Sequence, residues 1–231
     1  MKERFMVKIE VAKPINFNEL ITSKEAEVVS MRILNQPNSY ISLFSLAKDE
    51  EITAEAMLGN RYYYCFNGNG EIFIENNKKV ISNGDFLEIT ANHNYSIEAR
   101  DNLKLIEIGE KIGEGNMENK TLKMLESASA FNLAEVVEYQ EGKIVSKNLV
   151  AKPNLVMTIM SFWKGESLDP HKAPGDALVT VLDGALYSSF LLGSRIPYCT
   201  RDTVSVFLSL FCGFCSYLCS KEGNFCPADI A

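Results

Sequence analysis

The chain has 231 residues, of which 46% are hydrophobic and 23% charged, so it fits one large globular domain or two domains of roughly 100–120 residues. The formal net charge of −7, without any run of basic residues, argues against a nucleic-acid partner, because phosphate binding needs clustered Lys and Arg. The first residues lack the apolar core of a signal peptide, so we expect a cytoplasmic protein with no membrane partner.

Residues 27–108 contain many short runs rich in β-branched and aromatic residues, such as SYISLFSL, RYYYCF and EIFIE. Turn signals separate the runs, among them Asn67-Gly68 and Asn83-Gly84. Short strands at roughly ten-residue spacing predict an all-β sandwich or barrel. Residues 111–130 are charged, contain glycine and end in a short helical pattern, so we interpret them as a linker.

The first half of the chain then returns with an offset of 116 residues. The matched positions hold residue types that fix turns: Pro37 and Pro153, Asn38 and Asn154, Gly59 and Gly175, Gly68 and Gly184. Such residues in register over a long segment are hard to obtain by chance, because each determines a local backbone conformation. The sequence therefore predicts two structural copies of one β-rich design.

Residues 165–184, GESLDPHKAPGDALVTVLDG, contain two short β-rich runs joined by a turn that carries His171. This histidine, the following Pro174-Gly175-Asp176 and the strand closed by Asp183-Gly184 resemble the first motif of the cupin family. Residues 131–182 are also similar to small single-barrel cupin 2 proteins.

Applied to both copies, the resemblance implies an all-β bicupin with two tandem jelly-roll barrels. The first barrel would span residues 1–110, the linker residues 111–130, and the second barrel residues 131–231. Cupins often pair through their barrels, so the resemblance also implies a homodimer.

A cupin metal site uses three histidines and a carboxylate that converge inside the barrel, with positions left open for substrate or oxygen. In the first copy the matching positions hold Glu55, Met57, Arg61 and Tyr95. Arg61 would place a fixed positive charge where the metal ion should bind. The resemblance therefore predicts a first barrel that does not coordinate a metal.

Strand alternation places Arg61, Tyr63 and Cys65 on the face that would line this barrel. We interpret Arg61, Tyr63, Glu55 and Tyr95 as candidate ligand-binding residues. An arginine among tyrosines can bind a carboxylate or phosphate group by charge-assisted hydrogen bonds. The alternative, which we favour, is that Arg61 pairs with Glu55 across a strand pair and only fills the former site.

In the second copy the first-motif positions hold His171, Ala173 and Ala177, and no histidine follows His171. His171 is a candidate ligand for Fe, Mn, Ni or Zn if Asp176, water or substrate completes the site. The alternative role of His171 is a hydrogen bond within its turn.

Residues 185–231 lack the alternation and the Asn-Gly turns of the first copy, and they contain five of the six cysteines. One interpretation is a zinc or iron–sulfur cluster on Cys212, Cys215, Cys219 and Cys226. Another is a membrane anchor at residues 203–219, although a span needs roughly 20 residues. We favour a third, in which the chain departs from its ancestor after Gly184, for example by a reading-frame change. The second barrel would then be incomplete, with unpaired strand edges.

Two functions follow from the resemblance. The first is a non-catalytic cupin that binds a small molecule or has a structural role. The second is a metal-dependent enzyme, a dioxygenase or isomerase of a small polar substrate, centred on His171 in the second barrel. Metal analysis separates these two functions.

Overall fold

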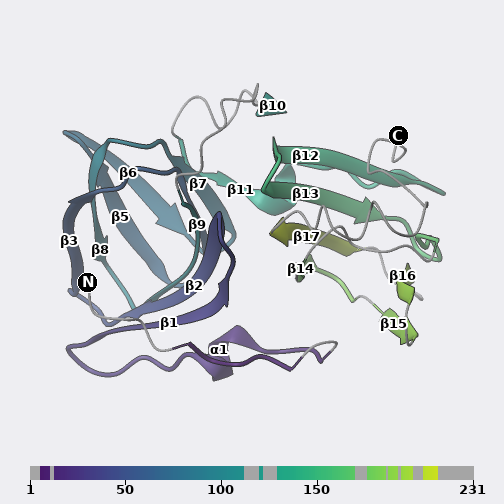
Figure 1. The fold of residues 1–231 in the computed structure, drawn as a ribbon, viewed down its shortest axis with the longest axis horizontal. Helices are drawn as coiled ribbons and strands as arrows, with labels where there is room; N and C mark the ends of the chain where they lie inside the picture. The colour runs from purple at the N-terminus through teal and green to yellow at the C-terminus, as the bar shows by residue number, and fades with distance from the viewer. Residues whose placement is uncertain are drawn as a thin grey trace. The chain divides into compact units, whose positions relative to one another are not determined.

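The computed structural model describes residues 6–10, 13–111, 120–121, 129–169, 176–185, 187–191, 194–199 and 205–212. The chain divides into two compact units, Met1–Gly115 with Thr121–Val136, and Asn116–Lys120 with Val137–Ala231. Almost every element is a strand, which confirms the all-β prediction (Figure 1). Among the described residues no helix has the length and apolar character that a membrane span requires.

Two sheets form the first unit. The larger sheet has the strand order β1 (Val28–Asn35), β2 (Ser39–Leu46), β9 (Leu103–Glu110), β4 (Arg61–Asn67), β7 (Asp85–Ile89) and β11 (Phe131–Asn132). The smaller sheet has the order β3 (Glu51–Ala56), β8 (Asn94–Ala99), β5 (Asn69–Ile74) and β6 (Asn77–Ser82). A single-turn helix, α1 (Phe17–Leu20), is capped by Asn16, whose side chain accepts a hydrogen bond from the Asn18 amide.

The core of the first unit lies between the two sheets. It forms because alternate residues of each strand point to the same face, so an apolar residue at every second position gives an apolar inner face. The cluster includes Phe44, Cys65, Leu87 and Leu105 from the larger sheet and Ile72, Ile81, Ile97 and Ala99 from the smaller one. All of these side chains are buried, and each buried aliphatic or aromatic side chain contributes about 1.5–3 kcal/mol of transfer free energy.

The segment that follows the predicted linker joins the first unit. Phe131 pairs with Phe86 of β7, and the Leu133 amide donates to the Gly84 carbonyl at 3.0 Å. A 3-10 helix, η1 (Leu133–Glu135), follows, and the Leu133 side chain is buried. Residues 131–136 are thus part of the first unit, whereas the sequence analysis assigned them to the second barrel. The short strand β11 extends the edge of β7, a pairing that local sequence patterns do not reveal.

Most of the second unit is one sheet and one hairpin. The sheet has the order β10 (Lys120–Thr121), β12 (Ile144–Lys152), β13 (Leu155–Phe162), β17 (Ser205–Cys212) and β14 (Asp176–Asp183). The hairpin pairs β15 (Tyr187–Leu191) with β16 (Ser194–Cys199). Of residues 203–219, interpreted above as a possible membrane anchor, 205–212 form strand β17 and the others lie outside the described residues.

The repeat found in the sequence is also a repeat of backbone geometry. In the β1–β2 hairpin Val28 pairs with Leu46, with a bulge between Arg32 and Leu34. In the β12–β13 hairpin Ile144 pairs with Phe162, with a bulge between Asn148 and Val150, so every one of these positions is shifted by 116. The positive-φ residues recur at the same offset: Ala26 and Gly142, Asp49 and Gly165, Gly68 and Gly184.

Strand β17 occupies the place in its sheet that β9 has in the first unit. β9 lies between β2 and β4, and β17 lies between the matching strands β13 and β14. However, 20 residues separate β6 from β9 and include β7 and β8, whereas only five separate β16 from β17. The connection between β16 and β17 is therefore too short to hold counterparts of β7 and β8. Val181 of β14 is 43% exposed, whereas its counterpart Cys65 is fully buried.

Candidate functional site

The larger sheet of the first unit carries a row of polar side chains on its inner face. Alternation along β4 places Arg61 and Tyr63 on this face, and both are buried. From the smaller sheet, Tyr95 of β8 is buried opposite them and pairs in the ladder with the half-buried Glu55 of β3. The structure therefore brings together Tyr63, Tyr95 and Glu55, three of the four predicted ligand-binding residues.

A chain of hydrogen bonds links these residues. The Tyr63 and Tyr95 hydroxyls lie 2.9 Å apart, and the Tyr95 hydroxyl donates to Glu55 Oε1 at 3.2 Å. Tyr63 also donates to Oε2 of Glu107 at 2.9 Å. The two rings meet edge to face, with 6.0 Å between their centroids. The chain therefore connects the half-buried carboxylate of Glu55 with the buried carboxylate of Glu107.

Glu107 was not among the predicted site residues. It is 1% exposed and lies on β9 opposite Tyr63. The signal that points to it is an acidic residue in the inward row of the strand LKLIEIGE, two residues after the apolar Leu105. A carboxylate so deeply buried is costly unless donors satisfy it, and the neighbouring phenols are such donors.

Tyr40 is the second residue that the sequence analysis missed. Its ring lies across Gly109, where an added Cβ would come within 2.1 Å of Tyr40 Cζ. The Arg32 guanidinium carbon is 3.6 Å from the centroid of this ring, and that of Arg61 is 5.1 Å away. Both guanidinium groups therefore lie near the Tyr40 ring, and cation–π attraction stabilises this arrangement.

The tyrosines of this cluster are neutral hydrogen-bond donors. Burial raises the pKa of Tyr40, Tyr63 and Tyr95 well above the ordinary phenol value, and the charge of Glu107 raises the pKa of each further. A hydrogen bond to Glu107 adds to the effect on the pKa of Tyr40. The phenols accordingly hold their protons through the physiological pH range.

Arg61 is fixed mainly by backbone carbonyls. Its Nη1 donates to the carbonyl oxygens of Gly59 at 3.0 Å, Asn60 at 3.0 Å and Glu110 at 2.8 Å. Within the described residues no ion pair joins Arg61 to Glu55, so the favoured alternative of the sequence analysis is wrong. Arg61 donates instead to carbonyls beside the start of β4 and at the end of β9, and Glu55 accepts from Tyr95.

The donor set of the first barrel does not suit a metal ion. The positions that match the family's ligands hold a cation, a neutral phenol, a thioether and one carboxylate. In the described part of the chain, no group of three or more His, Cys, Asp or Glu side chains could hold a metal ion. His171, Cys215, Cys219 and Cys226 lie outside the described residues.

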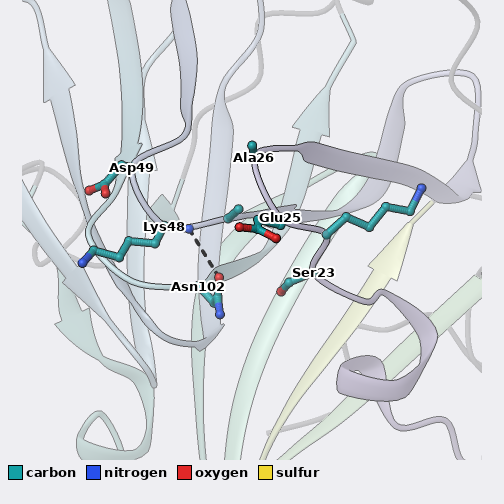
Figure 2. Close-up of a pocket in the computed structure, with 8 residues that line it drawn as sticks. Ser23, Glu25, Ala26, Lys48, Asp49 and Asn102 are labelled. Carbon is teal, nitrogen blue, oxygen red and sulfur yellow. Dashed lines mark hydrogen bonds between the residues drawn. The ribbon is translucent and has the colours of Figure 1, made fainter.

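An open surface pocket lies at the end of β2 remote from Tyr40 (Figure 2). Its lining is Ser23, Lys24, Glu25, Ala26, Ala47, Lys48, Asp49 and Asn102. The Lys48 amide donates to Asn102 Oδ1 at 3.3 Å across the pocket. Two lysines and two acidic residues are among the lining residues, so the pocket has no marked preference for charge.

Comparison with known proteins identifies the family. No family model and no curated protein matches the chain. Among solved structures, a cupin 2 conserved barrel domain protein from Leptotrichia buccalis is 75% identical, over 90% of this chain and 99% of that one, with a TM-score of 0.76. This chain therefore belongs to the cupin superfamily, as the sequence motif predicted.

More distant structures show the fold alone. A salicylate 1,2-dioxygenase from Pseudaminobacter salicylatoxidans is 11% identical, over 79% of this chain and 75% of that one, with a TM-score of 0.58. A variant of oxalate decarboxylase from Bacillus subtilis is 11% identical, over 83% of this chain and 74% of that one, with a TM-score of 0.52.

Proposed function

We propose that this protein is a non-catalytic cupin that binds a small molecule inside its first barrel. The observation that carries this proposal is the buried chain of hydrogen bonds through Glu55, Tyr95, Tyr63 and Glu107. It occupies the region where a cupin barrel holds its ligands, and it replaces metal-binding groups with phenols and carboxylates. A binding site of this kind is mostly apolar, with a few convergent polar groups that orient the ligand.

The groups of the cluster are better suited to binding than to reaction. The phenols keep their protons because burial raises the pKa of Tyr63 and Tyr95, so neither tyrosine is an effective base near neutral pH. Arg61 is fixed on backbone carbonyls.

The proposal includes two tandem barrels, the second of them incomplete. The 116-residue offset of the hairpins and of the positive-φ residues supports this organisation. The five-residue connection between β16 and β17 supports incompleteness, because it leaves no room for two further strands. We also propose that the protein is cytoplasmic and forms a homodimer. Sedimentation of the purified chain tests the dimer.

Native mass spectrometry of the full chain, purified from its source organism, tests the binding function. We expect a co-purifying small molecule that is lost in Tyr95→Phe, which removes the hydroxyl that bonds Tyr63 and Glu55. Tyr64→Phe is the matched control, because Tyr64 is also buried on β4 but points to the opposite face. A chain without any bound molecule, and with no hit in a metabolite screen, contradicts the proposal.

The alternative is a metal-dependent enzyme in the second barrel, a dioxygenase or isomerase that uses His171. The fold similarity to a salicylate dioxygenase and to an oxalate decarboxylase favours it. Stoichiometric Fe, Mn, Ni or Zn that disappears in His171→Ala would support the enzyme and replace our proposal. A chain purified without metal would rule out this metal-dependent enzyme.

A further inference from the structure

One edge of the sheet in the second unit is open. β14 lies at the end of the strand order, and its ladder partner is β17 (Figure 1). In the first unit the matching strand β4 has β9 on one side and β7 on the other, and both run antiparallel to it. Within the described residues no strand takes the place of β7 beside β14. The side of β14 that faces away from β17 is therefore a template for a further antiparallel strand.

The other edges of the three sheets that have four or more strands are protected. β10 and β11 are each two residues long, and short edge strands offer little to pair with. β6 carries two lysines and β3 two glutamates, which oppose edge pairing. Beside β1, the Val7 amide donates to the Arg32 carbonyl at 3.0 Å. β14 has none of these protections, because its eight residues contain the uncharged run ALVTVL.

The apolar side chains along this edge are only partly covered. Val181 is 43% exposed although it lies on the inner face of the sheet. Val179, two residues earlier on the same face, packs against Phe162 but is half-buried. On the outer face Leu178 and Thr180 are half-buried as well. A strand that paired with β14 would remove more of this apolar surface from water, which is favourable.

A second copy of β14 has the right orientation for this edge. Two identical edge strands related by a two-fold axis perpendicular to the sheet run antiparallel, as β7 does beside β4. Both copies then turn the same face inward, so residues that lie opposite each other differ by an even number of positions. The axis therefore passes through a residue. With the axis at Thr180, Val179 of each copy lies opposite Val181 of the other.

The charges of β14 also permit this pairing. Its aspartates, Asp176 and Asp183, stand at the two ends of the strand. With the axis at Thr180, Asp183 lies opposite Ala177 of the other copy and Asp176 opposite Gly184, so the aspartates do not face each other. Asp183 also accepts a hydrogen bond from the Tyr139 hydroxyl at 2.7 Å. Aliphatic side chains thus meet along the middle of the contact, and like charges are not opposed in it.

We propose that two copies of this chain associate through their β14 edges, so that their second units share one continuous antiparallel sheet. This inference rests on the proposed homodimer and names its interface. The β14 strand of the second copy takes the place that β7 has beside β4 in the first unit. The short connection between β16 and β17, which leaves no room for a counterpart of β7, is thereby compensated by association.

Analytical ultracentrifugation of the full chain, at several concentrations and with a reducing agent, measures the Kd of the dimer. Thr180→Lys places two lysines opposite each other at the axis, and Thr180→Glu places two glutamates there. We expect each variant alone to raise the Kd by about ten-fold or more, because like charges face each other across the interface. An equimolar mixture of the two variants should form a heterodimer with a Kd near that of the wild type, because lysine then faces glutamate.

Ser146→Lys is the matched control. Ser146 is exposed on β12, in the same sheet, and β13 and β17 separate β12 from β14. The substitution adds the same charge to a strand of the same sheet without touching the proposed interface. It should leave the Kd of the dimer unchanged.

A wild-type dimer whose Kd is unchanged in Thr180→Lys would overturn the β14 interface while leaving the homodimer intact. A chain that is monomeric at every concentration would refute both. If both variants lose the dimer and their mixture does not restore it, the pairing about Thr180 is overturned, because the substitutions then act on the fold of the unit. Slow hydrogen exchange of the amides of residues 177–182 in a monomeric chain would also overturn the inference, since another part of the same chain would then cover the edge.

Discussion

The repeat predicts that glycine at position 26 stabilises the first unit, because the backbone of Ala26 has a φ of 54°. The matching position in the second copy is Gly142, with a φ of 64°. A non-glycine residue in this left-handed region costs about 1–2 kcal/mol of backbone strain, which glycine removes. Glycine also loses more chain entropy on folding, and this loss offsets roughly 0.5–1 kcal/mol of the gain. Ala26→Gly should therefore stabilise the first unit by about 0.5–1 kcal/mol, which raises its Tm by roughly 1–4 °C.

Differential scanning calorimetry of the full chain measures this shift. The reverse change, Gly142→Ala, should destabilise the second unit by about 1 kcal/mol through backbone strain. Steric conflict plays no part, because an added Cβ at Gly142 would meet no atom within 4 Å. Ala47→Gly is the control, since Ala47 is buried and outside the positive-φ set, and its substitution should destabilise. If Ala26→Gly lowers the Tm as Ala47→Gly does, the reasoning from the repeat is refuted.

Three further predictions concern individual side chains of the first unit. Gly109→Ala should cost about 1–3 kcal/mol by overpacking, because the new Cβ would lie within 2.1 Å of the Tyr40 ring; a urea midpoint equal to that of the wild type would contradict this. The hydrogen bond from Arg100 is the largest cause that lowers the pKa of Glu71, to about 2. The ionised Glu71 therefore stabilises the fold above the ordinary carboxyl pKa, and this stabilisation is lost as the pH falls through about 2. Carboxyl NMR titration should show the pKa of Glu71 rising in Arg100→Gln, and an unchanged titration would count against the pairing. Burial raises the pKa of Cys65 to about 12, so iodoacetamide at pH 8 should label this thiol only after unfolding, as peptide mapping would reveal.

The fold could be predicted from the sequence largely because turns are local. Glycine, proline and asparagine fix the backbone at their own positions, so Gly68 and its counterpart Gly184 revealed the repeat directly. Alternation along β4 also placed Arg61 and Tyr63 correctly on the inner face. Each of these inferences needed only neighbouring residues.

The site was harder to predict because its contacts join strands that are distant in the chain. Glu107 and Tyr40 reach the cluster from β9 and β2, and nothing near either residue in the sequence indicates that β9 lies between β2 and β4. The expected pair of Arg61 with Glu55 is wrong because each residue has other partners, backbone carbonyls for Arg61 and the Tyr95 hydroxyl for Glu55.

The tail shows a further limit. Residues 205–212, SVFLSLFC, lack the alternation of a surface strand, and we did not expect them to continue the repeat. They nevertheless form β17 at the centre of a sheet, with β13 and β14 on either side. A short apolar run of this kind is compatible with a strand or with another buried segment, and periodicity alone does not distinguish them.

The central position of β9 and β17 has a consequence for how the chain folds. Each is made after both of the strands that it separates, β2 and β4 in one unit, β13 and β14 in the other. During synthesis the two earlier strands cannot join one sheet, because the strand that lies between them has not yet left the ribosome. Such late, long-range insertion slows folding, and truncation just before Ser205 would leave the second sheet divided.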